Sequence, residues 1–227
     1  MIAIGDSFTQ GAGDGTGRGY PARVLEQATQ ERPGSTITNF GQSGWTSDAL
    51  IRGDRELPGQ LERALAEVDS ALSQGRGAAV FVWIGGNDLW YLYDRGGDVT
   101  VEQEERDAER FAENMDTILT ALRDTGAQVI VALLDDPSKR PAVSPSETFG
   151  GITPGEFASM SLQVVRYNEI IRQKAEQYGA LTVDFYGADI FANPAAMSED
   201  GFHPNQAGYD LIAQKWLEAL APLLRGG

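Results

Sequence analysis

The sequence of 227 residues contains no cysteine. The chain therefore forms no disulfide and offers no thiolate to a metal ion. Covalent catalysis through a cysteine is excluded for the same reason. Because cysteine usage is the main sequence evidence for an oxidising or reducing compartment, this sequence gives none.

Positive charge is also scarce. The chain has 18 Lys and Arg against 33 Asp and Glu, which gives a formal net charge of −15 at pH 7. This excess repels the phosphates of nucleic acids and anionic lipid surfaces, so we expect neither as a partner. The charge is typical of a well-hydrated surface and leaves the oligomeric state open.

Long hydrophobic runs are missing as well. No segment approaches the roughly 18 apolar residues of a membrane-spanning helix, so no stable membrane insertion is expected. The first residues lack the basic-then-apolar pattern of a secretion signal, because Gly5 and Asp6 arrive at once. We expect a cytoplasmic protein, with a longer precursor as the alternative because only residues 1–4 precede this glycine.

Histidine occurs once, at His203, in the string Asp200-Gly201-Phe202-His203-Pro204. An imidazole has a reference pKa of about 6.5 and is the side chain best suited to act as a base near neutral pH. His203 is therefore the only candidate base of that kind. One histidine and no cysteine leave only scattered carboxylates as metal ligands, so we expect no metal site and no cofactor.

Five short runs of β-branched and apolar residues alternate with longer segments of helical spacing. They predict strands at residues 2–4, 36–40, 78–84, 128–134 and 181–185. The third run is apolar throughout and needs cover on both faces, which is typical of a parallel sheet between helices. We predict a single domain over residues 1–227 with an α/β fold: a three-layer α/β/α sandwich around a five-stranded parallel sheet, flavodoxin-like in arrangement.

Several segments are predicted to meet at one edge of this sheet. Ligands of such sheets bind outside the carboxyl ends of the strands, which is where Ser7, residues 41–47 and Asn87 fall. The segment 135–154 follows the fourth strand and contains four prolines and two adjacent glycines. It is longer than a routine connection and is either a substrate-shaping loop or an ordered surface loop without a function.

Four strings in this order carry a family resemblance. They are Gly5-Asp6-Ser7-Phe8-Thr9, then Asn-Phe-Gly-Gln-Ser-Gly-Trp-Thr-Ser at residues 39–47, then Gly85-Gly86-Asn87-Asp88, and finally Asp200-Gly201-Phe202-His203-Pro204. Together they resemble the SGNH hydrolase family, also called the GDSL esterase/lipase family. The family's first string ends in leucine where this chain has Phe8, which is also apolar. The resemblance implies the SGNH hydrolase fold and serine-dependent ester hydrolysis.

The resemblance implies that Ser7 is the nucleophile. His203 would take the serine proton and return it to the leaving alcohol, and Asp200 would orient the imidazole from three residues away. Glu199 is the alternative orienting carboxylate. Activity should fall as acid protonates the imidazole, because only the neutral ring accepts a proton.

The resemblance also implies three donors of an oxyanion hole. They are the backbone N–H groups of Ser7 and Gly44 and the side-chain amide of Asn87, with Gly41 as the alternative to Gly44. Asp6 and Asp88, which lie inside the same strings, are better interpreted as structural residues that bond loop backbone.

The aromatic residues Trp45, Trp90 and Tyr91 lie next to the oxyanion strings and are candidate substrate-binding residues. Such rings pack acyl chains or stack on sugars, although they also cover sheet edges. Since no long apolar lid helix is evident, we predict a serine esterase that hydrolyses small carboxylic esters, with short acyl or O-acetyl groups, through an acyl-enzyme. The alternatives are a lysophospholipase, a thioesterase or an acyltransferase with the same triad, and a non-enzymatic carbohydrate-binding protein.

Overall fold

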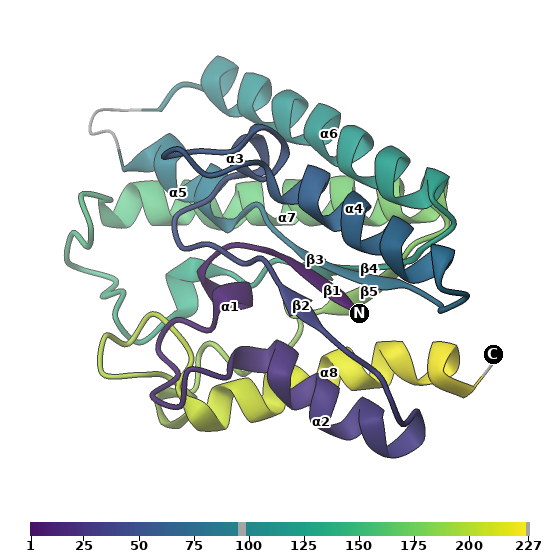
Figure 1. Cartoon of the computed structure of the whole chain (residues 1–227). Helices are drawn as coiled ribbons and strands as arrows, with labels where there is room; N and C mark the ends of the chain where they lie inside the picture. The colour runs from purple at the N-terminus through teal and green to yellow at the C-terminus, as the bar shows by residue number, and fades with distance from the viewer. Residues whose placement is uncertain (95–98, 226–227) are drawn as a thin grey trace.

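The computed structural model describes residues 1–94 and 99–225, in which strands and helices alternate along the chain (Figure 1). The strands are β1 (Ile2–Gly5), β2 (Thr38–Asn39), β3 (Ala79–Trp83), β4 (Gln128–Leu133) and β5 (Leu181–Asp184). The α-helices are α1 (Ser7–Gln10), α2 (Gly19–Glu31), α3 (Ser47–Arg52), α4 (Gln60–Ser73), α5 (Gly86–Tyr93), α6 (Val101–Asp124), α7 (Pro154–Tyr178) and α8 (Gln206–Arg225). Two 3-10 turns, η1 (Pro137–Lys139) and η2 (Pro194–Ala196), lie in the connections.

The five strands form one parallel sheet in the order β2-β1-β3-β4-β5. This order is that of flavodoxin-like folds, so the predicted fold class and sheet are confirmed. Four strands are shorter than predicted and β1 is one residue longer, and the edge strand β2, which pairs with β1 alone, is the shortest.

Helices cover both faces of the sheet, as Figure 1 shows: α2 and α8 lie on one face, and α4, α6 and α7 lie on the other. The apolar strand β3 is buried on both sides. On the α2 and α8 face, the ring of Trp83 stacks on Phe185 with centroids 4.3 Å apart, and Tyr20 stacks on Trp216 at 5.1 Å. This aromatic packing fixes β3 and β5 relative to the two helices.

The two longest helices, α6 and α7, begin at capping boxes. The side chain of Thr100 accepts from the backbone of Gln103, and Thr153 accepts from Glu156, each with the reciprocal bond in place. Such caps satisfy backbone N–H groups that have no partner inside the helix. Both helices then bury one apolar stripe against the sheet, which in α6 includes Phe111.

The connections that follow β1 to β5 gather at the carboxyl-terminal end of the sheet, and α8 begins at the same end. Sequence segments that are far apart along the chain are thereby brought together there. Within the described residues, no helix combines the length and the apolar character that crossing a membrane requires.

Candidate active site

The turn that carries Ser7 is built by close packing at the end of β1. A Cβ atom on Gly5 would lie 2.1 Å from the carbonyl oxygen of Trp83, so only glycine fits beside β3. The side chain of Gln60 bonds both the N–H and the carbonyl of Gly5, at 2.7 and 2.9 Å. The carboxylate of Asp6 then accepts from the N–H of Phe8 at 3.0 Å and caps α1. Ser7 therefore occupies the first position of a short, rigidly held helix.

His203 connects this serine to Asp200. Nε2 of His203 lies 3.2 Å from Oγ of Ser7, and Nδ1 lies 2.7 Å from Oδ2 of Asp200. Ser7 and His203 are 196 positions apart in the sequence. The arrangement is the one in which an imidazole can take a hydroxyl proton while a carboxylate holds its tautomer. Glu199 is exposed, and the described residues show no bond between it and His203.

The second oxygen of Asp200 is also fully engaged. Oδ1 accepts from the backbone N–H groups of Phe202 and His203, both at 2.8 Å, and from Oγ of Ser198 at 2.7 Å. Partial burial acts to raise the pKa of Asp200, but the bonds from His203, Phe202 and Ser198 outweigh it and hold the pKa well below its ordinary value. This carboxylate therefore stays ionised beside the ring.

The predicted oxyanion donors follow β1, β2 and β3: Ser7 begins α1, Gly44 lies in the loop after β2, and Asn87 lies in the first turn of α5. Nδ2 of Asn87 donates to the carbonyl of Trp45 at 2.9 Å, which orients the amide and leaves its second hydrogen for another acceptor. The backbone of Gly44 has φ +78°, and among the described residues its N–H and that of Ser7 have no protein acceptor. All three groups are therefore free to donate to a substrate oxygen.

Gly41, the alternative donor, has a packing reason to be glycine. A Cβ atom there would lie 2.3 Å from the backbone nitrogen of Gln10. The loop after β2 is thus pressed against α1, and the amide N–H of Ser43 donates to Oε1 of Gln10 at 2.9 Å. These contacts join the second string to the serine turn.

Asp88 ties the same loop to α5. Its two carboxylate oxygens accept from the N–H of Ser47 at 2.9 Å and from the Ser47 hydroxyl at 2.5 Å. Burial raises the pKa of Asp88 to about 6, and burial likewise raises the pKa of Asp6 to about 7. These contacts with the N–H groups of Phe8 and Ser47, at the starts of α1 and α3, confirm that Asp6 and Asp88 bond backbone.

The three candidate aromatic residues have different surroundings. Trp90 and Tyr91 are half-buried on α5, and the Trp90 ring packs edge-on against Phe149 and Phe202. Trp45 departs from the expectation, because its side chain is 1 % exposed and lies in the core. Its backbone carbonyl, rather than its ring, contacts a predicted site residue, because it accepts from Nδ2 of Asn87.

The segment 135–154 lies against the histidine string. The N–H of Ala142 donates to the carbonyl of Gly201 at 3.0 Å, and Phe149 stacks beside Phe202. Sequence reasoning did not single out Phe149, Phe202 or Arg140 of this region. A signal was available for Phe202, because it directly precedes the proposed base in the sequence, but nothing local marks Phe149 as its neighbour or Arg140 as buried.

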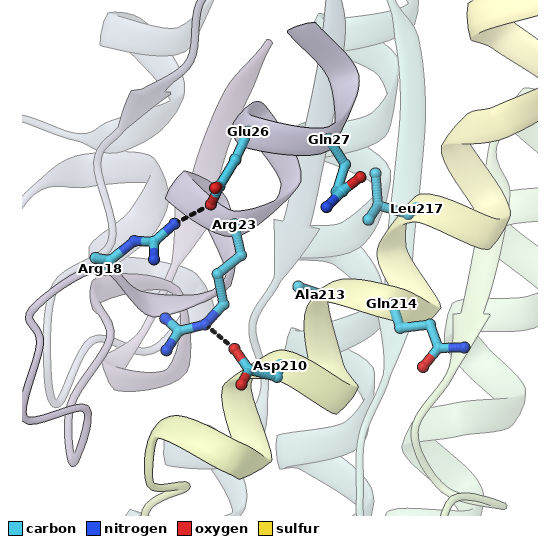
Figure 2. Close-up of a pocket in the computed structure, with 8 residues that line it drawn as sticks. All are labelled: Arg18, Arg23, Glu26, Gln27, Asp210, Ala213, Gln214 and Leu217. Carbon is cyan, nitrogen blue, oxygen red and sulfur yellow. Dashed lines mark hydrogen bonds and ion pairs between the residues drawn. The ribbon is translucent and has the colours of Figure 1, made fainter. Parts of the chain in front are cut away.

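A separate hollow of about 360 Å³ lies between α2 and α8, and Figure 2 shows the residues that line it. Its lining combines charged and polar side chains with Ala213 and Leu217, and it contains none of the predicted site residues. Arg23 contacts Asp210 there and also donates to Asp14 at 2.6 Å. These ion pairs fasten the segment after α1 to α8, directly after the histidine string.

No group of three or more His, Asp or Glu side chains in the described part of the chain is placed to hold a metal ion. The expectation of a cofactor-free reaction remains a prediction.

Comparison with known proteins identifies the class of the chain. A profile of the GDSL-like lipase/acylhydrolase family matches residues 3–211, so the chain belongs to this family. The family resemblance of the four strings is thereby confirmed, and the protein is a hydrolase that acts on ester bonds.

Individual relatives are distant. The chain is 25% identical over 230 residues to YpmR of Bacillus subtilis (strain 168), covering 97% of this chain and 80% of that protein. Among solved structures, TesA is 20% identical with a TM-score of 0.66 over 98% of both chains. A variant of Axe2, an acetyl xylan esterase from Geobacillus stearothermophilus, is 22% identical with a TM-score of 0.62 over 96% of this chain and 93% of that one. At this identity the two structures establish the shared fold alone.

Proposed function

We propose that the protein is a serine esterase that hydrolyses small carboxylic esters with short acyl groups, O-acetyl groups on sugars among them. The observation that carries the proposal is the continuous line of hydrogen bonds from Ser7 through His203 to Asp200, with contacts of 3.2 and 2.7 Å. Membership of a family of lipases and acylhydrolases supports it.

In the first half of the reaction, Oγ of Ser7 attacks the ester carbonyl carbon while its proton passes to Nε2 of His203. The carbonyl oxygen becomes an oxyanion that accepts hydrogen bonds from the N–H groups of Ser7 and Gly44 and from the amide of Asn87. Collapse of this intermediate breaks the bond to the alcohol, which leaves with the proton from His203. Ser7 is then acylated.

In the second half, water attacks the acyl-enzyme and gives its proton to His203. The bond to Oγ of Ser7 breaks, the free acid leaves, and the proton on His203 returns to the serine. Asp200 stays ionised throughout and stabilises the imidazolium that forms in both halves, in keeping with its lowered pKa.

The acyl and sugar preferences are supported by the surroundings of His203. Trp90, Phe149 and Phe202 form an aromatic cluster beside it, with Trp90 and Phe202 rings 5.0 Å apart and Phe202 5.4 Å from the imidazole. Aromatic faces suit a short acyl group or a sugar ring. Axe2, which shares the fold, is an acetyl xylan esterase, and this makes acetylated xylo-oligosaccharides the first natural esters to test.

The test compares hydrolysis of p-nitrophenyl acetate, butyrate and octanoate by the wild type and by Ser7→Ala near pH 8. Serine-dependent activity that falls with chain length is expected, together with acetate release from acetylated xylo-oligosaccharides. A preference for octanoate would favour a lysophospholipase or thioesterase instead, and acyl transfer to an added alcohol would reveal an acyltransferase.

A fluorophosphonate probe separates an enzyme from a sugar-binding protein. The probe should label the wild type at Ser7 and leave Ser7→Ala unlabelled. Absence of labelling in folded wild type, with sugar binding retained, would contradict the proposed function.

A further inference from the structure

A buried ion pair follows the carboxyl end of β4. Nε and Nη2 of Arg140 donate to the two oxygens of Asp135, each at 2.9 Å. The side chains of Arg140 and Asp135 are only 5 and 6 % exposed. A two-pronged contact of this kind fixes the plane of the guanidinium as well as its position.

The chain between the two partners is shaped to bring them together. Oδ1 of Asp136 accepts from the N–H and the hydroxyl of Ser138, at 3.1 and 2.8 Å, and so caps η1. This single turn begins at Pro137, whose ring suits the first position of a helical turn. After the turn, Arg140 returns to Asp135.

The guanidinium contacts an aromatic ring on each side of the proposed triad. Cζ of Arg140 lies 4.8 Å from the ring centre of Phe8 and 4.1 Å from that of Phe202. Phe8 directly follows Ser7, and Phe202 directly precedes His203. A cation over an aromatic face is attracted most strongly where water is excluded, as it is here.

The backbone adds a second link on the histidine side. The N–H of Ala142 donates to the carbonyl of Gly201, and a Cβ atom on Gly201 would lie 3.0 Å from that nitrogen. The segment that carries Arg140 is therefore packed tightly against the string that carries His203.

We propose that Arg140 is a positioning residue that holds Phe8 and Phe202 and thereby sets the distance between Oγ of Ser7 and Nε2 of His203. The inference rests on the proposed triad. Proton transfer needs a distance of roughly 2.6 to 3.2 Å, and the present 3.2 Å is at the long end, so a small shift of either neighbour matters. The proposal also explains Phe8, because the leucine of the family's string has no ring face to offer a guanidinium.

The first test is Arg140→Lys. Lysine keeps the positive charge beside Asp135 but loses the fixed plane that covers both rings. We expect kcat to fall about 10- to 100-fold with KM changed by less than about threefold, because reacting groups are misplaced while substrate contacts remain. The rate of phosphonylation of Ser7 by a small fluorophosphonate should fall with kcat.

The single histidine gives a readout that a purely structural role would not move. In protein labelled with ¹⁵N-histidine, every imidazole signal belongs to His203. Arg140→Lys should shift the Nε2 signal, which reports the bond to Ser7, and leave the Nδ1 signal bonded to Asp200 in place. Unchanged Nε2 signals in the folded variant would overturn the proposal.

Phe8→Leu is the second variant and carries the test alone if Arg140→Lys does not fold. It should lower kcat in the same direction, and the double variant should lose less than the product of the two single effects, because both remove one contact. Wild-type kcat in folded Phe8→Leu and Arg140→Lys would overturn the proposal, whereas activity that survives Ser7→Ala would instead contradict the triad.

Arg123→Lys is the matched control. Arg123 donates to the carbonyls of Tyr178 and Ala127, where α6 leads into the amino end of β4. The same chemical change at the amino end of the sheet should leave kcat and the Nε2 signal of His203 at their wild-type values. A loss of kcat equal to that of Arg140→Lys would mean that general destabilisation is the cause.

Discussion

Asp200, Asp6 and Asp88 all lie in the family strings described above. The environment of the Asp200 carboxylate is nevertheless the opposite of that around Asp6 and Asp88. The Asp200 side chain is 48 % exposed and accepts four hydrogen bonds, which hold its pKa below the ordinary value against partial burial. Asp6 is 4 % and Asp88 1 % exposed, and burial raises their pKa values to about 7 and about 6. Donors and water access, rather than nearness to Ser7, therefore decide which carboxylate can stabilise an imidazolium.

Among the variants that test this difference between the carboxylates, Asp200→Asn should have the largest effect. The variant keeps the shape of the side chain but removes the charge and favours the wrong tautomer of His203. We expect kcat to fall roughly 10³- to 10⁴-fold, as measured with p-nitrophenyl acetate. Glu199→Gln is the control, and a comparable loss in that variant would move the orienting role to Glu199.

A smaller loss is expected from Asn87→Ala, which leaves all three carboxylates in place. Removing one oxyanion donor costs about 10²- to 10³-fold in kcat, and KM should change little because the contact strengthens only in the transition state. Steady-state kinetics distinguish the two parameters. An intact kcat with a raised KM would show that Asn87 binds substrate without serving the oxyanion.

Asp88→Ala should affect stability more than chemistry. It leaves the N–H and hydroxyl of Ser47 buried without their acceptor, which costs about 1 to 3 kcal/mol for each unsatisfied group. Urea unfolding measures the loss. A variant as stable as the wild type would show that the contact between Asp88 and Ser47 contributes no net stability.

The effect of Asp6→Asn should be smallest near pH 4 and should depend on pH. The pKa of Asp6 is 3.8 in the reference state and about 7 in the fold, so the folded state binds more protons between these values. The stability contributed by protonated Asp6 is therefore complete below about pH 4 and is lost as the pH rises towards 7. Asparagine does not titrate and can still accept from the N–H of Phe8.

Urea unfolding of wild type and Asp6→Asn at pH 4, 5.5 and 8 tests this sign. The variant should gain on the wild type as the pH rises from 4 to 8, and the gain should level off above about pH 7. A difference in stability that is the same at all three pH values would show that Asp6 does not keep its proton in the fold.

The strands were predictable because their patterns are local. The run 78–84 is apolar throughout, and the structure buries β3 on both faces, as a central parallel strand requires. The edge strand β2 was predicted too long, because its length depends on pairing with β1 rather than on its own residues. The long segment 135–154 could be recognised as unusual from its prolines, but not where it packs.

Trp45 and Arg140 show where local patterns fail. Trp45 stands between a glycine and a threonine in a polar string, yet its ring is buried while its carbonyl accepts from Asn87. Arg140 lies in a proline-rich loop where an arginine is normally exposed. It is buried because Asp135 neutralises it and two aromatic rings from distant strings cover it.

The sequence by itself determined the alternation of strands and helices, the parallel sheet and the family, because each depends on short-range periodicity or on contiguous strings. It also limited the candidate imidazole base to His203 by offering no other histidine. Only the tertiary structure decided that Nε2 of His203 lies against Ser7, that Asp200 rather than Glu199 faces the ring, and that Asp6 and Asp88 are buried. Distances, exposure and pKa shifts depend on residues that meet from remote parts of the chain, and no local pattern contains them.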